Sequence, residues 1–171
     1  MSDPIVRAAR SEDIDPLMAI LDAVAAEDLY ISTEPGYDRD SRRAFWESSV
    51  DGTRVGFFVA VDGTAVVGLV GVYPHAEYGY LLGMMVAPSH RGRRFGAALL
   101  DAGIGWVRKR GGRAVHLLVF PHNTVARQMY ERRGFKQVDY FPHDVVRRNG
   151  DAWDTILMRK ELVASERGAD L

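Results

Sequence analysis

The spacing of apolar residues predicts four helices along the chain. After Ser11-Glu12-Asp13, apolar side chains recur every three or four residues up to Val24, so that one helical face carries them all. The same spacing returns in three later segments, at 41–49, 96–110 and 124–133. The polar segment 27–40 is interrupted by Pro35-Gly36, and we expect a loop there.

Shorter apolar and β-branched runs predict seven strands. These runs lie at 5–8, 55–61, 64–73, 78–86, 114–120, 136–146 and 152–160. Asp62-Gly63 and Asn149-Gly150 are typical of tight hairpin turns, which imply antiparallel neighbours, whereas two later strand–helix units imply some parallel pairing. The order predicts a mixed α/β fold with a single domain at 1–162 and a disordered tail at 163–171.

Composition excludes several classes of protein and site. The 171 residues are 47% apolar and 26% charged, which is enough for one domain with a core, and the net charge of −1 gives no general attraction to nucleic acid or membranes. The absence of cysteine excludes disulfides and a thiol nucleophile, and no other ligand spacing predicts a metal site. Because the chain shows neither a signal-peptide core nor an apolar run of roughly 20 residues, we expect a cytoplasmic protein.

The stretch from Met84 to Leu100 carries the most specific chemistry. An apolar run ends at Ala87-Pro88, a basic turn follows at 91–96, and a helix is predicted directly after it. The first N–H groups of a helix have no partner inside the helix and carry a partial positive charge. This stretch therefore predicts a phosphate site, to which nearby arginines would add positive charge.

Three kinds of phosphate site compete for this turn. A nucleotide-binding P-loop requires Gly-Lys-Ser/Thr, and that ending is missing. A dinucleotide fingerprint requires Gly-x-Gly-x-x-Gly after the first strand of a repeated unit, and the spacing here differs. The third is a turn for the pyrophosphate of coenzyme A, and a solvated basic turn is the simplest alternative to all three.

The turn resembles a motif of the GCN5-related N-acetyltransferase (GNAT) superfamily. The family has Arg or Gln, two variable residues, Gly, one variable residue and then Gly or Ala, between its fourth strand and third helix. This chain reads Arg91, Gly92, Arg93, Arg94, Phe95, Gly96, so that Arg94 replaces the family's glycine. A side chain is compatible with that position if its φ is not positive.

A second block, NTVARQMYERRGF, is similar to the family's fourth helix through Asn123, Ala126, Tyr130, Glu131, Gly134 and Phe135. The segment TILMRKEL also looks like the family's last strand, so the resemblance covers nearly the whole chain. It implies the GNAT fold: a mostly antiparallel sheet of about seven strands, splayed between the fourth and fifth strands and flanked by about four helices.

The resemblance also implies a set of residues that bind acetyl-CoA. The pantetheine arm would pair with strand backbone, the pyrophosphate would meet the turn, and two residues of the fourth helix would line the same cleft. The implied residues are Met84, Met85, Val86, Arg91, Gly92, Arg93, Arg94, Phe95, Gly96, Ala97, Asn123, Ala126 and Tyr130. Asn123 also fits the N-cap of the fourth helix, and a packing role is the simpler alternative for Tyr130.

The implied reaction is acetyl transfer from acetyl-CoA to a primary amine, by direct attack through a tetrahedral intermediate. Tyr130 would donate a proton to the departing thiolate, and the N–H of Met85 would stabilise the oxyanion. Family members that act on ribosomal proteins often have a glutamate as base where this chain has Leu118. Glu77 is therefore the candidate base, with His75 as an alternative, each acting through water.

The identity of the acceptor is the least determined feature. A small-molecule amine is the preferred interpretation, and Tyr30, Glu34 and Tyr37 are its candidate contacts because the corresponding family region lines the acceptor pocket. Acetylation of a protein N-terminus or lysine and a non-catalytic acyl-CoA-binding module are the alternatives. Nucleic-acid binding is a distant third interpretation. Neither a membrane nor a metal is expected to take part. Dimers are common in the family, so a homodimer is compatible with the resemblance.

Overall fold

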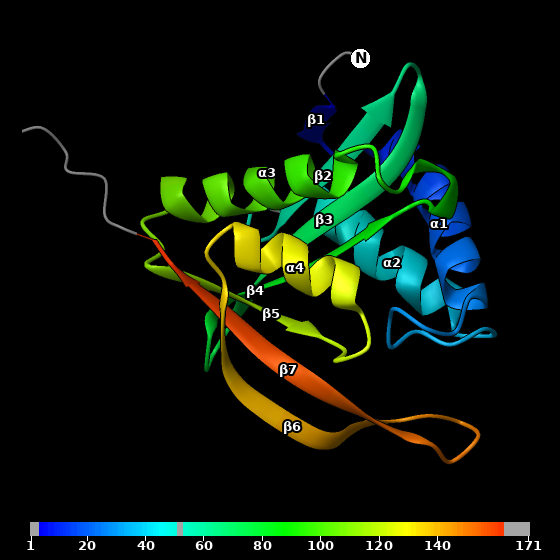
Figure 1. Cartoon of the computed structure of the whole chain (residues 1–171). Coiled ribbons are helices and arrows are strands. Elements are labelled where there is room, and N and C mark those ends of the chain that lie inside the picture. The colour runs from blue at the N-terminus through cyan, green and yellow to red at the C-terminus, as the bar shows by residue number, and fades with distance from the viewer. Residues whose placement is uncertain (1–3, 51–52, 163–171) are drawn as a thin grey trace, which may run out of the picture.

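The computed structural model describes residues 4–50 and 53–162, which contain one sheet of seven strands (Figure 1). The spatial order of the strands is β1-β2-β3-β4-β5-β7-β6, and all neighbours are antiparallel except β4 and β5. The strands are β1 Ile5–Ala8, β2 Gly56–Asp62, β3 Ala65–His75, β4 Gly79–Val86, β5 Ala114–Val119, β6 Lys136–Val146 and β7 Ala152–Glu161. The predicted mixed α/β sheet is confirmed.

Four α-helices flank the sheet, and short 3₁₀ turns precede two of them (Figure 1). The helices are α1 Ile14–Ala26, α2 Arg39–Val50, α3 Phe95–Lys109 and α4 Thr124–Arg132, and the 3₁₀ turns are Ser11–Asp13 and Pro88–His90. The predicted helices are confirmed, with bounds that differ by at most two residues. Within the described ranges, no helix is long and apolar enough to cross a membrane.

One core lies between the sheet and the helices α3 and α4. Leu99 and Ile104 of α3 and Tyr130 of α4 pack there with strand residues such as Leu82 and Leu117. Their spacing along the helices places them on one face, and burial of each such side chain stabilises the fold by roughly 1.5–3 kcal/mol.

A second core lies on the opposite face, under α1 and α2. It joins Leu17 of α1 and Trp46 of α2 to Val59, Leu69 and Met85 of strands β2, β3 and β4. In the described part of the chain, this core contains no residue of β5, β6 or β7. That half of the face is therefore left without a helix over it.

Strands β4 and β5 separate after a very short contact. Their parallel pairing consists of Leu81 with His116 and Leu82 with Leu117. From Gly83 onward β4 remains paired with β3 alone, while β5 continues beside β7. The splay expected between the fourth and fifth strands is confirmed, and it leaves a wedge that opens toward the start of α3.

The structure leaves two predictions about extent untested. The segment 163–171, expected to be a disordered tail, lies outside the described residues. The limit of the single domain expected at 1–162 is likewise a prediction, although residues up to Leu162 take part in the first core.

Candidate active site

The unpaired edge of β4 forms one wall of the wedge. The N–H of Ala87 donates to the carbonyl of Val67 at 2.8 Å, so this end of the strand bonds to β3. Backbone groups alternate in direction along a strand, and the β3–β4 register has no shift. Met85 therefore also points its amide toward β3, whereas Met84 and Val86 direct theirs into the gap. The Met85 amide, which was expected to face the thioester, therefore points away from the gap.

The turn before α3 presents a row of backbone amides at the mouth of the wedge. Gly92 has φ +75°, and Arg94, the N-cap of α3, has φ +66° with no side-chain cap. The N–H of Arg91 donates to Pro88 and that of Ala98 donates to Arg94, whereas in the described part of the chain the amides of Gly92 and of residues 95–97 have no backbone acceptor. Left-handed residues alternating with ordinary ones turn successive N–H groups to one side, and such a concavity binds anions.

The positive φ of Arg94 contradicts the condition set for a side chain at this position. The backbone of Arg94 has the left-handed conformation that the family's glycine adopts. For a residue with a side chain, this conformation costs about 1–2 kcal/mol. The shape of the turn is therefore preserved, and the strain falls on Arg94.

The space around the turn fits a phosphate-bearing ligand. A Cβ at Gly92 would meet no atom within 4 Å, so the space on that side of Gly92 is open. A Cβ at Gly96 would lie 3.2 Å from Cε of Met84, which shows how closely α3 approaches the end of β4. The turn before α3 and the unpaired edge of β4 are thus contiguous.

The side chains of two turn arginines are engaged by carboxylates. Arg91 donates to both oxygens of Glu27, at 2.7 and 2.6 Å, and its guanidinium lies 5.1 Å from the ring centre of Tyr30. Arg93 pairs with Asp62 at 2.8 Å. Backbone amides are therefore the groups that remain for the phosphates, while Arg91 joins this turn to the loop between α1 and α2.

Helix α4 forms the other wall of the wedge. Asn123 is its N-cap, and its Oδ1 accepts from the N–H of Ala126 at 3.3 Å, which confirms the capping role. Tyr130 is only 7% exposed, and its ring centre lies 5.9 Å from that of Phe135, so the packing role is confirmed too. Burial alone raises the pKa of Tyr130 to about 12, and no hydrogen bond to its hydroxyl occurs within residues 4–50 and 53–162. The contacts of Asn123, Ala126 and Tyr130 with a ligand stay predictions.

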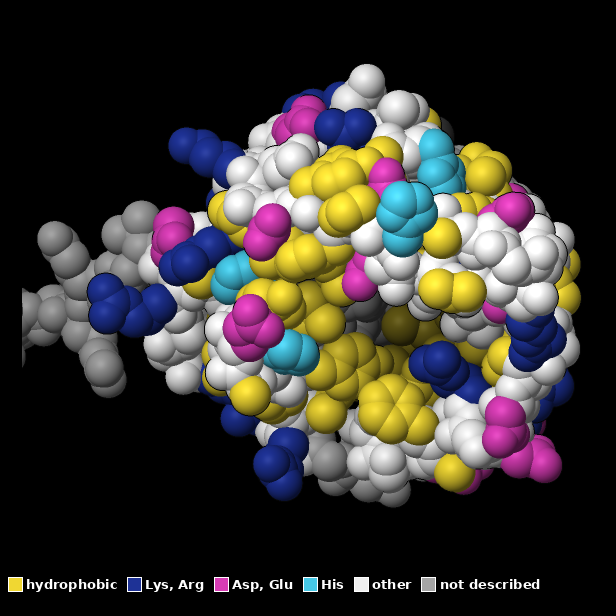
Figure 2. Space-filling view, turned by 90° about the horizontal axis from the view of Figure 1, so that it is seen from below, with side chains coloured by type: hydrophobic (Ala, Val, Ile, Leu, Met, Phe, Trp, Pro, Cys, Tyr) yellow, Lys and Arg dark blue, Asp and Glu magenta, His cyan; other side chains and the backbone are white. Residues whose placement is uncertain are grey.

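On the face opposite α3, the sheet is open where the strands separate. Leu118, which occupies the position of the family's glutamate, is 42% exposed there, and a Cβ at Gly83 would meet no atom within 4 Å. The lower side of the molecule, where the uncovered strands lie, is hollowed and lined largely by apolar side chains, with charged ones at the margin (Figure 2). An acceptor can reach the wedge from this side.

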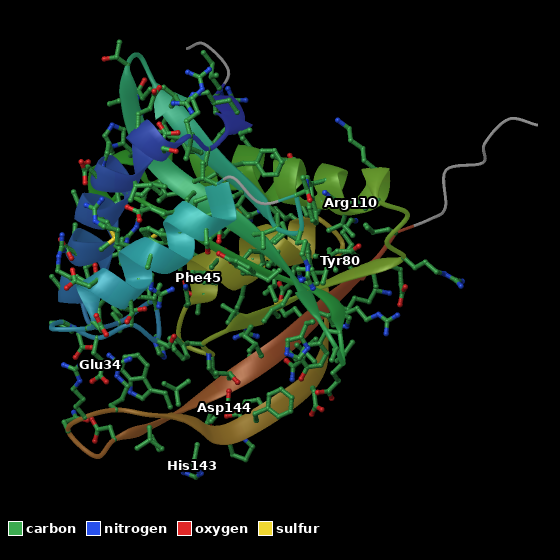
Figure 3. The ribbon with its side chains drawn as sticks, turned by 180° about the vertical axis from the view of Figure 1, so that it is seen from behind. Glu34, Phe45, Tyr80, Arg110, His143 and Asp144 are labelled. Atoms are coloured by element: carbon green, nitrogen blue, oxygen red, sulfur yellow. The ribbon has the colours of Figure 1, made fainter. Side chains whose placement is uncertain are left out.

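Tyr73 of β3 lies at the floor of this open face, and no sequence pattern indicated its role there. A Cβ at Gly71 would overlap the Tyr73 hydroxyl, so the ring folds back over Gly71. Phe45 of α2, directed toward the sheet in Figure 3, lies 5.6 Å from the Tyr73 ring centre. Burial raises the pKa of Tyr73 to about 12, so the hydroxyl is a neutral hydrogen-bonding group at pH 7. The only sequence signal near it is the glycine at position 71, which lies opposite Gly83 in the structure.

The loop between α1 and α2 is fixed to the turn of the β6–β7 hairpin. Arg147, 3% exposed, lies 4.1 Å from the Trp153 ring centre, pairs with Asp28 and donates to the carbonyl of Ser32 at 3.2 Å. Next to it, the N–H of Arg148 donates to Glu34 at 3.1 Å (Figure 3). One end of the open face is thereby closed.

The three candidate acceptor contacts of this loop are held by other protein groups. Tyr30 stacks with Arg91, Glu34 accepts from Arg148, and the Tyr37 hydroxyl donates to Asp22 at 2.8 Å. Their polar groups therefore shape the loop, and a direct contact with the acceptor stays a prediction.

A cavity of about 550 Å³ lies at the closed end of the β4–β5 pair. Glu77 lines it, as does His116, whose Nδ1 is buried without a partner. His75 accepts from the N–H of Glu77 at 3.3 Å. Gly79 and Met84 are about 17 Å apart along the strand at ~3.3 Å per residue, so Glu77 does not touch the reacting atoms.

Comparison with known proteins identifies the family. The Acetyltransferase (GNAT) family profile matches residues 21–135, from α1 to the end of the second sequence block. The chain belongs to the GNAT acetyltransferase family. Neither these contacts nor the match involves a metal, and in the described ranges no three His, Asp or Glu side chains are grouped to hold one.

Relatives of this GNAT protein differ in what they are named for. It is 38% identical to a mycothiol acetyltransferase of Geodermatophilus obscurus over 47% of this chain and 28% of that protein. It is 34% identical to an uncharacterized N-acetyltransferase of Methanocaldococcus jannaschii over 54% of this chain and 39% of that one. The aligned parts thus span well under half of either relative.

The fold is shared over nearly the full length. A phosphinothricin acetyltransferase of Sinorhizobium meliloti, solved in complex with acetyl-CoA, superposes with a TM-score of 0.84, at 18% identity, over 99% of this chain and 94% of that one. The architecture of the wedge therefore belongs to a fold on which a related protein binds acetyl-CoA.

Proposed function

We propose that this GNAT protein transfers an acetyl group from acetyl-CoA to the primary amine of a small molecule. One observation carries the proposal: the unpaired edge of β4 from Gly83 to Val86 continues directly into the turn before α3, where the amides of Gly92 and of residues 95–97 have no backbone acceptor among the described residues. An extended arm that pairs with a strand edge and ends in a diphosphate matches this arrangement.

The amine must attack in its neutral form. Its nitrogen adds to the acetyl carbon to give a tetrahedral intermediate, which collapses with cleavage of the bond from that carbon to sulfur, and the ammonium proton leaves before or during the attack. Glu77 receives this proton through water in the cavity beside His116, since it is too far away for direct contact. His75 is less suitable, because its Nδ1 already accepts a backbone N–H.

Charge on the carbonyl oxygen is stabilised by backbone. The Met84 amide points into the gap and is the donor nearest the point where β4 leaves β5. Loss of one such donor typically costs about 10²–10³ in turnover.

Tyr130 assists departure of the sulfur. Its hydroxyl has a pKa of about 12, well above the ~8.5 of an ordinary thiol, so it donates a hydrogen bond while the coenzyme leaves as thiolate. A full proton transfer from Tyr130 would be uphill, which makes hydrogen-bond donation the larger part of its role.

The closed end of the open face favours a small acceptor. Arg147 and Arg148 fix the α1–α2 loop across that end, so an extended peptide would lack an exit there. Protein acetylation would instead need a groove open at both ends.

The experiment is a thioester-consumption assay with acetyl-CoA and a panel of primary amines and peptides. We expect turnover with small amines, together with slowed hydrogen exchange at 83–86 and 92–97 when coenzyme A is added. Slowed exchange without any turnover would identify a binding module, turnover restricted to peptides would identify a protein acetyltransferase, and unchanged exchange would refute the proposed docking.

A further inference from the structure

The wall of the open face contributed by α2 contains an arginine without a carboxylate. Arg42 is half-buried, and its guanidinium lies 5.9 Å from the ring centre of Trp46. Within residues 4–50 and 53–162, no Asp or Glu pairs with it and no hydrogen bond involves its side chain. The flat guanidinium is held against an indole, with its N–H groups free.

Neighbouring arginines differ from Arg42 in this respect. On the same helix, Arg39 pairs with Asp22 and Arg43 pairs with Asp15. Around the loop, Arg91 pairs with Glu27 and Arg147 with Asp28. Removing a cation partly from water without a counter-charge is costly, and an arginine fork is well matched to a carboxylate. The contrast indicates that the counter-charge of Arg42 arrives with a ligand.

Arg42 lies close to the reacting end of the wedge. Its charge acts on the hydroxyls of Tyr73 and Tyr37, and it favours the ionised form of each. The Tyr73 hydroxyl covers Gly71, whose register partner on β4 is Gly83. Gly83 is the first residue of β4 that has lost its partner on β5, so this arginine borders the place where an acceptor meets the thioester.

We propose that Arg42 binds a carboxylate of the acceptor, which makes the acceptor an amino acid or a close analogue. The inference rests on the proposed function and names its substrate class. Arg42 forms an ion pair with the carboxylate, and the Tyr73 hydroxyl accepts a hydrogen bond from the attacking amine. The bond between nitrogen and the acetyl carbon then forms as described above, and the carboxylate takes no part in it.

A carboxylate on the opposite side of the open face, from β6, would favour a different class of acceptor. Asp144 of β6 accepts from Thr155 at 2.6 Å, and it is exposed beside the uncovered strands (Figure 3). If Asp144 determined selectivity, the preferred acceptor would carry a second cation, as a polyamine does.

Matched pairs of acceptors distinguish selection by Arg42 from selection by Asp144. Each pair consists of an amino acid and its decarboxylated amine, such as phenylalanine with phenethylamine and ornithine with 1,4-diaminobutane. We expect kcat/KM at least tenfold higher for the amino acid of each pair, at one acetyl-CoA concentration. Equal or higher values for the amines would overturn the inference while leaving acetyl transfer established.

Substitution of Arg42 tests the assignment directly. We expect Arg42→Gln to lower kcat/KM for amino acids at least tenfold, mainly through KM, and to leave the decarboxylated amines within twofold. Arg42→Lys should recover only part of the kcat/KM for amino acids, because lysine keeps the positive charge but lacks the two parallel N–H donors of the guanidinium. Arg43→Gln is the control, since that residue is on the same helix and already paired. An equal loss for both members of each pair would overturn the assignment.

Binding of the product separates this inference from the reaction itself. We expect an N-acetyl amino acid to bind to the wild-type protein in the presence of coenzyme A by calorimetry, and to bind at least tenfold more weakly to Arg42→Gln. If no amine is acetylated but this difference in binding is seen, the proposed acetyl transfer is overturned and the carboxylate site at Arg42 is supported. No difference in binding would overturn the site.

Discussion

Gly71 of β3 lies directly opposite Gly83 of β4, at the level where β4 parts from β5. The two glycines face different surroundings: a side chain at Gly71 would overlap the hydroxyl of Tyr73, whereas a side chain at Gly83 would meet open space. Residues opposite each other in an antiparallel pair have side chains about 4.5–5.5 Å apart. The Tyr73 hydroxyl therefore lies over the proposed site of reaction, on the proposed acceptor side.

This pair gives the first prediction. Gly83→Ala should change the free energy of unfolding by less than about 1 kcal/mol, because space is available, and should lower turnover because its methyl group enters the acceptor side. Gly71→Ala should destabilise by about 1–3 kcal/mol, because Tyr73 must move. Urea unfolding and steady-state kinetics measure both effects, and equal stability losses in the two variants would contradict the geometry.

The second prediction concerns Tyr130. We expect Tyr130→Phe to lower kcat by roughly 10- to 100-fold, because the departing sulfur loses a hydrogen bond in the transition state, and to leave the Kd of acetyl-CoA nearly unchanged. The wild-type rate should show no loss from Tyr130 ionisation below about pH 11, since its raised pKa of about 12 keeps the hydroxyl neutral. Equal kcat in the two proteins would remove Tyr130 from the chemistry.

The third prediction concerns the strained backbone of Arg94. Arg94→Gly should be more stable than Arg94→Ala by about 1 kcal/mol, because both lack the side chain and only alanine keeps the cost of a positive φ. Thermal or urea unfolding of the two variants provides the comparison. At Arg93, where no positive φ occurs, the same pair should show the opposite order, with alanine favoured.

The fourth prediction concerns His116 and the pH dependence of stability. Burial, and secondarily the charge of Arg159, lowers the pKa of His116 below its usual value, while Glu161 and a backbone hydrogen bond to Tyr78 act in the opposite direction. The unfolded chain then binds a proton that the folded chain does not, so this contribution is complete above about pH 6.5 and is lost as the pH falls.

His116→Gln should flatten the loss of unfolding free energy between pH 7.5 and 5.5. His143→Gln is the matched control, because the His143 side chain is exposed and is not among the groups that act on His116. Urea midpoints at the two pH values measure the difference. A wild-type slope retained in His116→Gln would show that other groups cause the pH dependence.

The fold and the position of the turn before α3 could be predicted because their signals are local. Strand alternation, Asp62-Gly63 and the two sequence blocks fixed the element order, the splay and the turn at Arg91 to Gly96. The direction of the Met85 amide depends on strand register, which a single sequence leaves open. The φ of Arg94 likewise depends on the turn as a whole and not on the residue itself.

The acceptor side could not be predicted because it is assembled from distant segments. Arg42, Tyr73 and Arg147 come from three separate elements, and nothing in their sequence neighbours distinguishes them from ordinary surface or core residues. The polar groups of Glu34 and Tyr37, which the resemblance implied as acceptor contacts, turn toward Arg148 and Asp22. Only tertiary structure shows which polar groups remain unpaired.

The two-residue contact between β4 and β5 has a consequence for the folded state itself. The sheet is incomplete where the strands diverge, and a bound ligand arm with amide groups would supply the missing rungs, as an eighth strand would. Because such a ligand binds only the native form, its concentration adds to the free energy that resists unfolding. The protein should therefore be most resistant to heat and proteolysis when its acyl donor is abundant, so that metabolic supply and the lifetime of the protein are linked.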